Sequence, residues 1–128
     1  MQDKRPSDRE LLKRINEAKA FLKERHGLFA NPAKAVGELH NLGIGESNEV
    51  WQLIRECLEE LTAKNYKGSR PPQKSYEKAI VGLELLAFSW WSLKFGKQMY
   101  IKFVLKNERY YYVSLHPCRA EEQGGEQS

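Results

Sequence analysis

Met99–Pro117 has the sequence MYIKFVLKNERYYYVSLHP. Its side chains alternate between apolar and polar, which predicts strands over 99–106 and 110–116, because successive side chains of a strand point to opposite faces. One face of each strand must then pack against a hydrophobic core. The side chains expected on that face are Met99, Ile101, Phe103 and Leu105 on the first strand and Tyr111, Val113 and Leu115 on the second.

The connection between these two strands decides which polar side chains meet on the other face. A three-residue loop, 107–109, keeps core residues opposite core residues, whereas a two-residue turn would mix the faces. That loop places Lys102 opposite Ser114 and Tyr100 opposite His116, with Cβ atoms about 5 Å apart. A phenol, an imidazole and an ammonium group are thus expected on one open face, which suits phosphate chemistry. Polar residues kept only for solubility are the alternative interpretation.

The aromatic-rich segment 88–95 is predicted to form a strand beside the first one. With Trp91, Leu93 and Phe95 on its core face, the same argument favours a three-residue loop, 96–98, and a tight turn with a β-bulge is the alternative. Two rows of side chains would then cross the open face: Lys94, Tyr100 and His116 in one, and Ser92, Lys102 and Ser114 in the next.

Three segments ahead of the strands carry apolar residues at helical spacing, 6–27, 31–43 and 47–65. Ser7 begins the first with a capping box, and Asn31 caps the second. N-terminal helices followed by a small antiparallel sheet predict an α+β fold, and 128 residues suit a single domain. We expect a helical part over 7–63, an exposed basic loop over 64–80, the sheet over 81–117 and a flexible tail over 118–128.

The composition favours a polyanionic partner, either nucleic acid or an acidic protein. The net charge is +4, and Tyr66 is followed by four positive charges in the sequence YKGSRPPQKSYEK. No apolar run approaches the roughly 20 residues of a membrane-spanning helix, and no apolar stretch of a secretory signal follows the N-terminus. Cys57 and Cys118 belong to no ligand cluster, so we expect a reducing cytoplasm, with Cys57 as a buried small hydrophobe.

Five short segments resemble the MqsR family, whose members are messenger-RNA-cleaving toxins of bacterial toxin–antitoxin pairs. The resemblance covers roughly 33–117, although the chain has SWWSL where family members carry a glutamine beside the aromatic strand. It implies a fold similar to RelE-type ribonucleases, with an active face of Lys, Tyr, Arg or His and no metal. The matching segments are AKAVGELHNLGI, VWQLIRECLEEL, NYKGS, GKQMYIKF and YYVSLHP.

The resemblance also implies a set of site residues. Tyr66 and Lys67 match the family's Tyr-Lys pair after the helix, and Tyr100 and Lys102 match its Tyr-x-Lys on the central strand. His116 stands where the best-known members have a lysine. The candidate catalytic residues are Lys67, Tyr100, Lys102 and His116, and the candidate substrate-binding residues are Tyr66, Arg70, Lys94, Ser114 and Tyr112.

These observations predict a metal-independent endoribonuclease without a cofactor. The 2′-hydroxyl of single-stranded RNA would attack the neighbouring phosphorus, with His116 as a proton-transfer group near neutral pH. A cognate antitoxin would neutralise the enzyme. A non-catalytic basic module that binds RNA or an acidic protein is the alternative, and in that case Tyr112 would serve for cross-strand packing.

Overall fold

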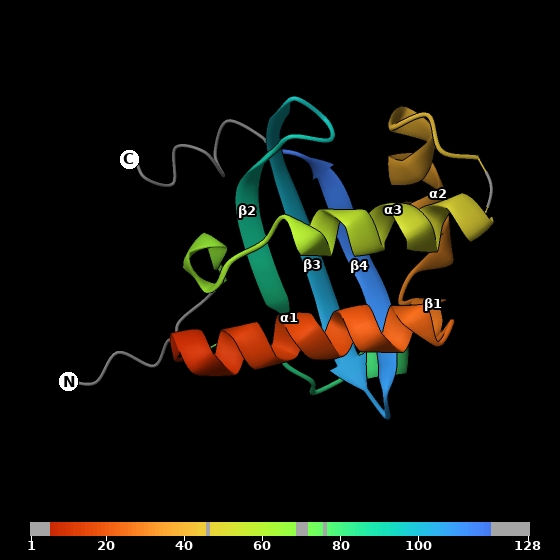
Figure 1. Ribbon diagram of the computed structural model, residues 1–128. Coiled ribbons are helices and arrows are strands. Elements are labelled where there is room, and N and C mark those ends of the chain that lie inside the picture. Colours follow the sequence, from red (N-terminus) through yellow and green to blue (C-terminus); the bar gives the residue numbers. More distant parts are fainter. Residues whose placement is uncertain (1–5, 46, 69–71, 76, 119–128) are drawn as a thin grey trace.

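Helices pack on a four-stranded sheet in the computed structural model, which describes residues 6–45, 47–68, 72–75 and 77–118 (Figure 1). The sheet has the order β1-β4-β3-β2, with β2, β3 and β4 as an antiparallel meander and β1 parallel to β4. The predicted α+β class is confirmed. The elements are α1 (Asp8–Lys23), β1 (Gly27–Phe29), α2 (Pro32–Asn41), α3 (Ser47–Glu59), η1 (Ala63–Asn65), η2 (Lys78–Ile80), β2 (Leu86–Ser92), β3 (Lys97–Lys106) and β4 (Arg109–Pro117).

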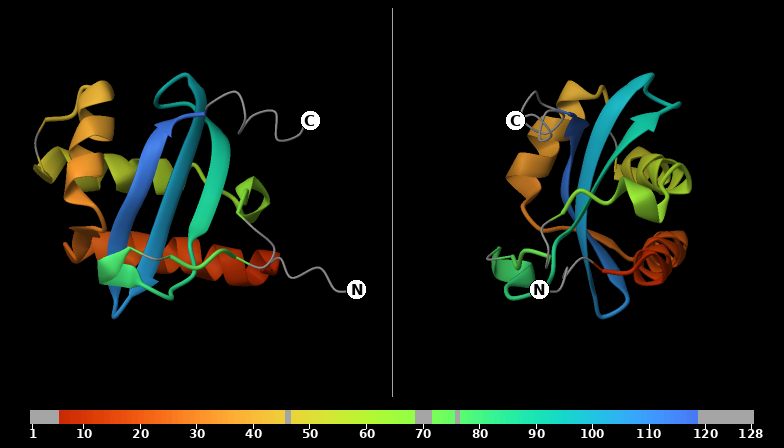
Figure 2. Two further views of the ribbon diagram at one scale, coloured as in Figure 1. Left: turned by 180° about the vertical axis from the view of Figure 1, so that it is seen from behind. Right: turned by 90° about the vertical axis from the view of Figure 1, so that its left-hand side faces the viewer.

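The two faces of the sheet have different covers. Helices α1 and α3 lie on one face, and α2 and η2 lie on the other side of the molecule (Figure 2). Apolar side chains of α1, α3 and the sheet form the main core, which includes Met99, Ile101 and Phe103 as predicted. A small second cluster lies under η2, and its buried members are Ile80, Val104 and Val113.

The predicted helix starts are confirmed. The Ser7 side chain accepts a hydrogen bond from the amide of Glu10 at 3.0 Å, and Asn31 accepts one from the amide of Lys34 at 3.2 Å. Strand β1, with three residues, is too short to show a period and was not predicted. A Cβ atom on Gly27 would lie 2.7 Å from the Trp51 ring, so only glycine lets β1 pack this closely on α3.

A two-residue turn, Asn107-Glu108, joins β3 to β4, so the expected three-residue loop is wrong. The φ angles of the two residues are 52° and 61°, which is the left-handed conformation that a type I′ hairpin turn requires. This turn matches the natural twist of the flanking strands. Lys106 therefore lies directly opposite Arg109.

A β-bulge in β4 nevertheless restores the predicted pairs beyond the turn. Tyr112 lies opposite Phe103 and Ser114 opposite Lys102, which makes Val113 the extra residue. The predicted pairings Lys102–Ser114 and Tyr100–His116 are confirmed.

The bulge also reverses the alternation of β4. Tyr110 and Tyr112 belong to the main core before the bulge, and Leu115 belongs to it after the bulge. The expectation that Tyr111 and Val113 share that core is wrong, because both pack with the second cluster instead.

The predicted register of β2 is wrong by five positions, and its two faces are exchanged. Trp90 is 2% exposed and belongs to the main core, whereas Trp91 is 60% exposed and Leu93 is 83% exposed. The connection to β3 spans 93–96, with Ser92 paired to Lys97. Consequently Ser89 lies opposite Tyr100 and Ala87 opposite Lys102, in the places predicted for Lys94 and Ser92.

Parts of the predicted exposed loop, 64–80, are buried. Ile80 is fully buried, Pro72 and Ser75 are buried, and Tyr66 forms an isolated bridge with Phe88. Arg70 and the tail residues 119–128 lie outside the described residues. Within the described ranges, no helix has the length and apolar character needed to cross a membrane.

Cys57 is a buried member of the main core, as the sequence predicted. Burial raises the pKa of its thiol to about 12, because the thiolate would lose its hydration there. Cys57 therefore acts as a small hydrophobic side chain at neutral pH.

The β3–β4 turn generates the first prediction. Glu108→Gly should raise the free energy of unfolding by about 0.5–1 kcal/mol, because glycine removes the left-handed strain of a side-chain-bearing residue at a smaller entropic cost. Urea denaturation followed by circular dichroism measures the change. Arg109→Gly, at the adjacent strand position, is the control and should destabilise the protein. A less stable Glu108→Gly variant would contradict the turn geometry.

Candidate functional site on the polar face of the sheet

The sheet face opposite α1 and α3 carries two rows of side chains. One row holds Ser89, Tyr100 and His116, and the next holds Ala87, Lys102 and Ser114. Trp91 and Gln98 form a further pair beside the first row. We call these eight residues the polar face: Ala87, Ser89, Trp91, Gln98, Tyr100, Lys102, Ser114 and His116.

Tyr100, His116 and Lys102 lie together on this face. The rings of Tyr100 and His116 are stacked, with centroids 5.1 Å apart and an interplanar angle of 26°. The ammonium group of Lys102 lies 5.7 Å from the centroid of the Tyr100 ring. The sequence predicted this grouping, and the bulge in β4 produces it.

The hydrogen bond of His116 selects its tautomer. Nδ1 lies 2.7 Å from the carbonyl oxygen of Pro117, and a carbonyl can only accept a hydrogen bond. Nδ1 therefore carries the proton, and Nε2 of the neutral ring keeps a lone pair. The side chain is largely enclosed, with 8% of the residue exposed, whereas Tyr100 and Lys102 are partly exposed.

Lys67 extends the second row across the edge of β2. Its amide donates a hydrogen bond to the carbonyl of Ala87 at 2.8 Å, and the preceding residue, Tyr66, packs in the core against Phe88. Because side chains alternate, Lys67 is on the same face as Ala87. The small side chain of Ala87 thus separates two lysines, Lys67 and Lys102, on the polar face.

Ser89, Gln98 and Cys118 form a hydrogen-bonded group at the end of the polar face. Ser89 Oγ accepts from Gln98 Nε2 at 2.9 Å and lies 3.1 Å from Cys118 Sγ. The amide of Cys118 donates to the carbonyl of Gln98 at 3.0 Å, so the hairpin continues to this residue. No sequence pattern indicated this group, because it depends on the register of β2.

A carboxylate of α2, Glu38, holds the edge of β4. Its two oxygens accept hydrogen bonds from the Tyr112 hydroxyl at 2.7 Å, the Ser114 hydroxyl at 2.7 Å and the Leu115 amide at 2.9 Å. Burial, together with the hydrogen bond to the Glu38 carboxylate, raises the pKa of the Tyr112 phenol, so Tyr112 stays a neutral donor.

The Glu38 contacts change the roles of two predicted substrate-binding residues. Tyr112 is buried, with an edge-to-face contact to Phe29 at 5.5 Å, and Ser114 is buried with its hydroxyl directed to Glu38. The structure therefore assigns both side chains to the support of the strand, which matches the cross-strand packing considered for Tyr112. No local pattern in the sequence indicated Glu38.

Lys94 lies away from the polar face, and its predicted place opposite Tyr100 is wrong. Its ammonium group pairs with Glu56 of α3 at 2.5 Å, and its amide donates to Glu60 at 3.0 Å. The hydrogen bond to Glu56 raises the pKa of Lys94 and lowers that of Glu56. Both groups are exposed, so the pair adds little stability.

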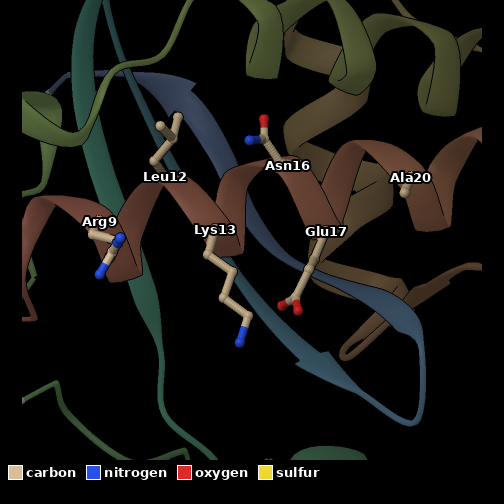
Figure 3. A pocket seen from close by; sticks show the side chains of 6 residues that line it. All are labelled: Arg9, Leu12, Lys13, Asn16, Glu17 and Ala20. Atoms are coloured by element: carbon tan, nitrogen blue, oxygen red, sulfur yellow. The ribbon is translucent and has the colours of Figure 1, made fainter.

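A hollow of about 480 Å³ on the outer side of α1 differs from the polar face in its lining (Figure 3). It mixes charges of both signs and lies on the helix that covers the other face of the sheet. Its lining has no histidine or aromatic residue for proton transfer or base stacking. The lining residues are Arg9, Leu12, Lys13, Asn16, Glu17 and Ala20.

Comparisons of the chain with models of protein families, with curated proteins and with solved structures found no match. Across the described part of the chain, no three His, Cys, Asp or Glu side chains are grouped so that they could hold a metal ion. The chemistry of the site is therefore argued from its own residues.

The edge contact of Glu38 generates a stability prediction. Glu38→Gln should lower the free energy of unfolding by about 2 kcal/mol, because hydrogen bonds to a charged group contribute roughly 1.5–3 kcal/mol. Urea denaturation measures the loss. Glu84→Gln removes an exposed carboxylate and should change the stability by less than about 0.5 kcal/mol. Equal effects of the two substitutions would show that Glu38 does not support β4.

Glu60, which directly follows α3, generates a pH prediction. Burial would raise the pKa of Glu60, but hydrogen bonds from Trp90, Ser92, Lys94 and Leu93 outweigh it and hold this pKa below the ordinary value of 4.5. A carboxyl with a lowered pKa stabilises the fold above its unfolded pKa and loses that contribution as the pH falls through the folded value.

Glu60→Gln should therefore be less stable than the wild-type protein at neutral pH, and the difference should shrink as the pH falls below about 4.5. Urea denaturation at several pH values, followed by tryptophan fluorescence, measures both effects. Glu59→Gln, at the exposed last residue of α3, should change the stability less at neutral pH. A difference that is constant over this pH range would refute the proposed role of Glu60.

Proposed function

We propose that this protein is a metal-independent endoribonuclease toxin that cleaves single-stranded mRNA in a bacterial cytoplasm and is neutralised by a cognate antitoxin. The observation that carries the proposal is the stacked pair Tyr100–His116 with the Lys102 ammonium group beside it. The resemblance of the segments NYKGS, GKQMYIKF and YYVSLHP to the MqsR family supports the same function.

Proton transfer in the proposed reaction begins at His116. Its Nε2 lone pair takes the proton of the 2′-hydroxyl while the 2′-oxygen bonds to phosphorus. The bond from phosphorus to the 5′-oxygen breaks, and that oxygen takes the proton of the Tyr100 hydroxyl. The products are a 2′,3′-cyclic phosphate and a 5′-hydroxyl. Exchange with water then returns a proton to Tyr100 and removes one from His116.

Two lysines stabilise the charge of the transition state in this proposal. Lys102 neighbours the Tyr100 ring, and Lys67 lies beyond Ala87 in the same row. Positive groups aimed at the phosphate oxygens lower the barrier most where the surrounding side chains exclude water. The enclosure of His116 provides such surroundings.

Neutralisation by an antitoxin is supported by the surface around the polar face. The net charge of +4 favours an acidic partner, and the exposed Trp91 offers an apolar anchor beside the candidate catalytic groups. A partner bound to Trp91 would cover Tyr100 and His116 and block access of RNA.

A non-catalytic RNA-binding module is the second candidate function. It is favoured by the small exposed fraction of His116, 8%, because a base that is covered in this way reaches a 2′-hydroxyl only after the surface opens. This module would bind single-stranded RNA by charge and stacking. Binding of RNA without cleavage distinguishes it from the nuclease.

The catalytic roles generate a prediction for RNA cleavage. His116→Ala and Lys102→Ala should each lower the cleavage rate of long single-stranded RNA by about 10²–10⁴-fold, because each removes a group that acts in the transition state. Cleavage is measured in EDTA, and growth arrest after expression gives a second readout.

Lys94→Ala is the matched control, because Lys94 lies in the β2–β3 connection and pairs with Glu56 of α3, away from the polar face, and it should keep full activity. Circular dichroism checks that each variant is folded. Full activity of folded His116→Ala and Lys102→Ala variants would refute the site.

A further inference from the structure

A hollow of about 260 Å³ opens beside Lys102, where the polar face meets the segment 73–75 and Glu77. Its walls come from three separate parts of the chain: the first turn of α2, this segment and the sheet. The sequence singled out none of these wall residues except Lys102. The lining consists of Lys34, Gln73, Lys74, Ser75, Glu77, Leu85, Lys102 and Val113.

Hydrogen bonds hold Gln73, Ser75 and Glu77 in place. The amide of Leu85 donates to the Gln73 carbonyl at 2.7 Å, and the amide of Ser75 donates to the Leu83 carbonyl at 2.8 Å. Ser75 Oγ accepts from the amide of Glu77 at 3.0 Å. These three lining residues are therefore held before a ligand binds, which lowers the entropic cost of binding.

The charge of the hollow is positive. Lys34, Lys74 and Lys102 contribute three ammonium groups, and Glu77 is the single acidic residue among the lining residues that the structure describes. Within the described part of the chain, no acidic side chain forms an ion pair with Lys34 or Lys74. The first turn of α2 also lacks an acidic residue, so its partial positive charge adds to the field.

We propose that this hollow binds a backbone phosphate of single-stranded RNA, one that neighbours the phosphate held at Tyr100 and His116. The link to cleavage rests on the proposed function, whereas the binding itself does not. Tyr100 and Lys102 are two residues apart on β3, about 6.6 Å. Lys102 lies between the stacked pair and the hollow, so it can contact the phosphates on both sides.

Nucleic acid fits this surface better than an acidic polypeptide. The lysines of the lining bind phosphate as point charges, and this charge alone suits a carboxylate as well, so the neighbouring rings distinguish the two partners. The stacked Tyr100–His116 pair and the exposed Trp91 offer flat ring systems for bases on the same face. An acidic polypeptide would use the charge of the hollow but not these rings.

The test measures binding without cleavage. A fluorescent 2′-O-methyl RNA oligonucleotide lacks the attacking hydroxyl, and its affinity is measured by anisotropy over a range of salt concentrations. The slope of log K against log salt is negative, and the Lys34→Gln/Lys74→Gln double variant should reduce its magnitude by about 0.7, the value for one lost phosphate contact. This change corresponds to an affinity about fivefold weaker near 0.1 M salt. Lys13→Gln on α1 is the matched control and should change neither quantity.

The outcomes separate this subsite from the nuclease. An unchanged slope and affinity in the folded double variant, or no binding by the wild-type protein, would overturn the subsite. Binding that depends on Lys34 and Lys74, in a protein that cleaves no unmodified RNA, would support the subsite and overturn the nuclease. Poly-glutamate binding that depends on these lysines, with RNA binding that does not, would assign the hollow to an acidic protein and overturn the proposal.

Discussion

The polar face depends on the carboxylate of Glu38 at the edge of β4. Strand β1 pairs with β4 only as far as Tyr112, so no strand of the described residues lies beside the next part of this edge. A bare strand edge leaves amide groups without partners. Glu38 accepts hydrogen bonds from the Leu115 amide and from the hydroxyls on both sides of the bulge, Tyr112 and Ser114. The Glu38 side chain of α2 thus accepts the hydrogen bond of an edge amide that a neighbouring strand would otherwise accept.

The pairs at the centre of the site could be predicted although the connection could not. A three-residue loop and a two-residue turn with a bulge both place one extra residue on the β4 side, and either brings Tyr100 opposite His116. Matching core faces therefore determines which residues pair at the site, but it does not determine where along β4 the extra residue lies. The chain places it at Val113 and keeps the favoured hairpin turn at 107–108.

Other features were beyond the sequence for physical reasons. Trp90 and Trp91 are equally apolar neighbours, so alternation alone cannot tell which one faces the core. The prediction placed Trp91 in the core and therefore Lys94 on the polar face, whereas Trp90 is buried and Lys94 pairs with Glu56. Long-range contacts leave no local pattern. Glu38 and Lys34 reach the sheet from α2 because that helix packs beside β4, which no periodicity in either segment specifies.

The bulge in β4 determines both which side chains enter the core and which lie on the polar face. With the same turn and no extra residue, β4 would shift by one position from Val113 onward, so that His116 would face the main core and Leu115 the polar face. An imidazole in that apolar core would lose its solvation, and an apolar side chain would replace it beside Tyr100. Val113 itself lines the hollow beside Lys102. One inserted residue, held by one carboxylate, therefore sets both the stacked pair and the wall of the neighbouring basic hollow.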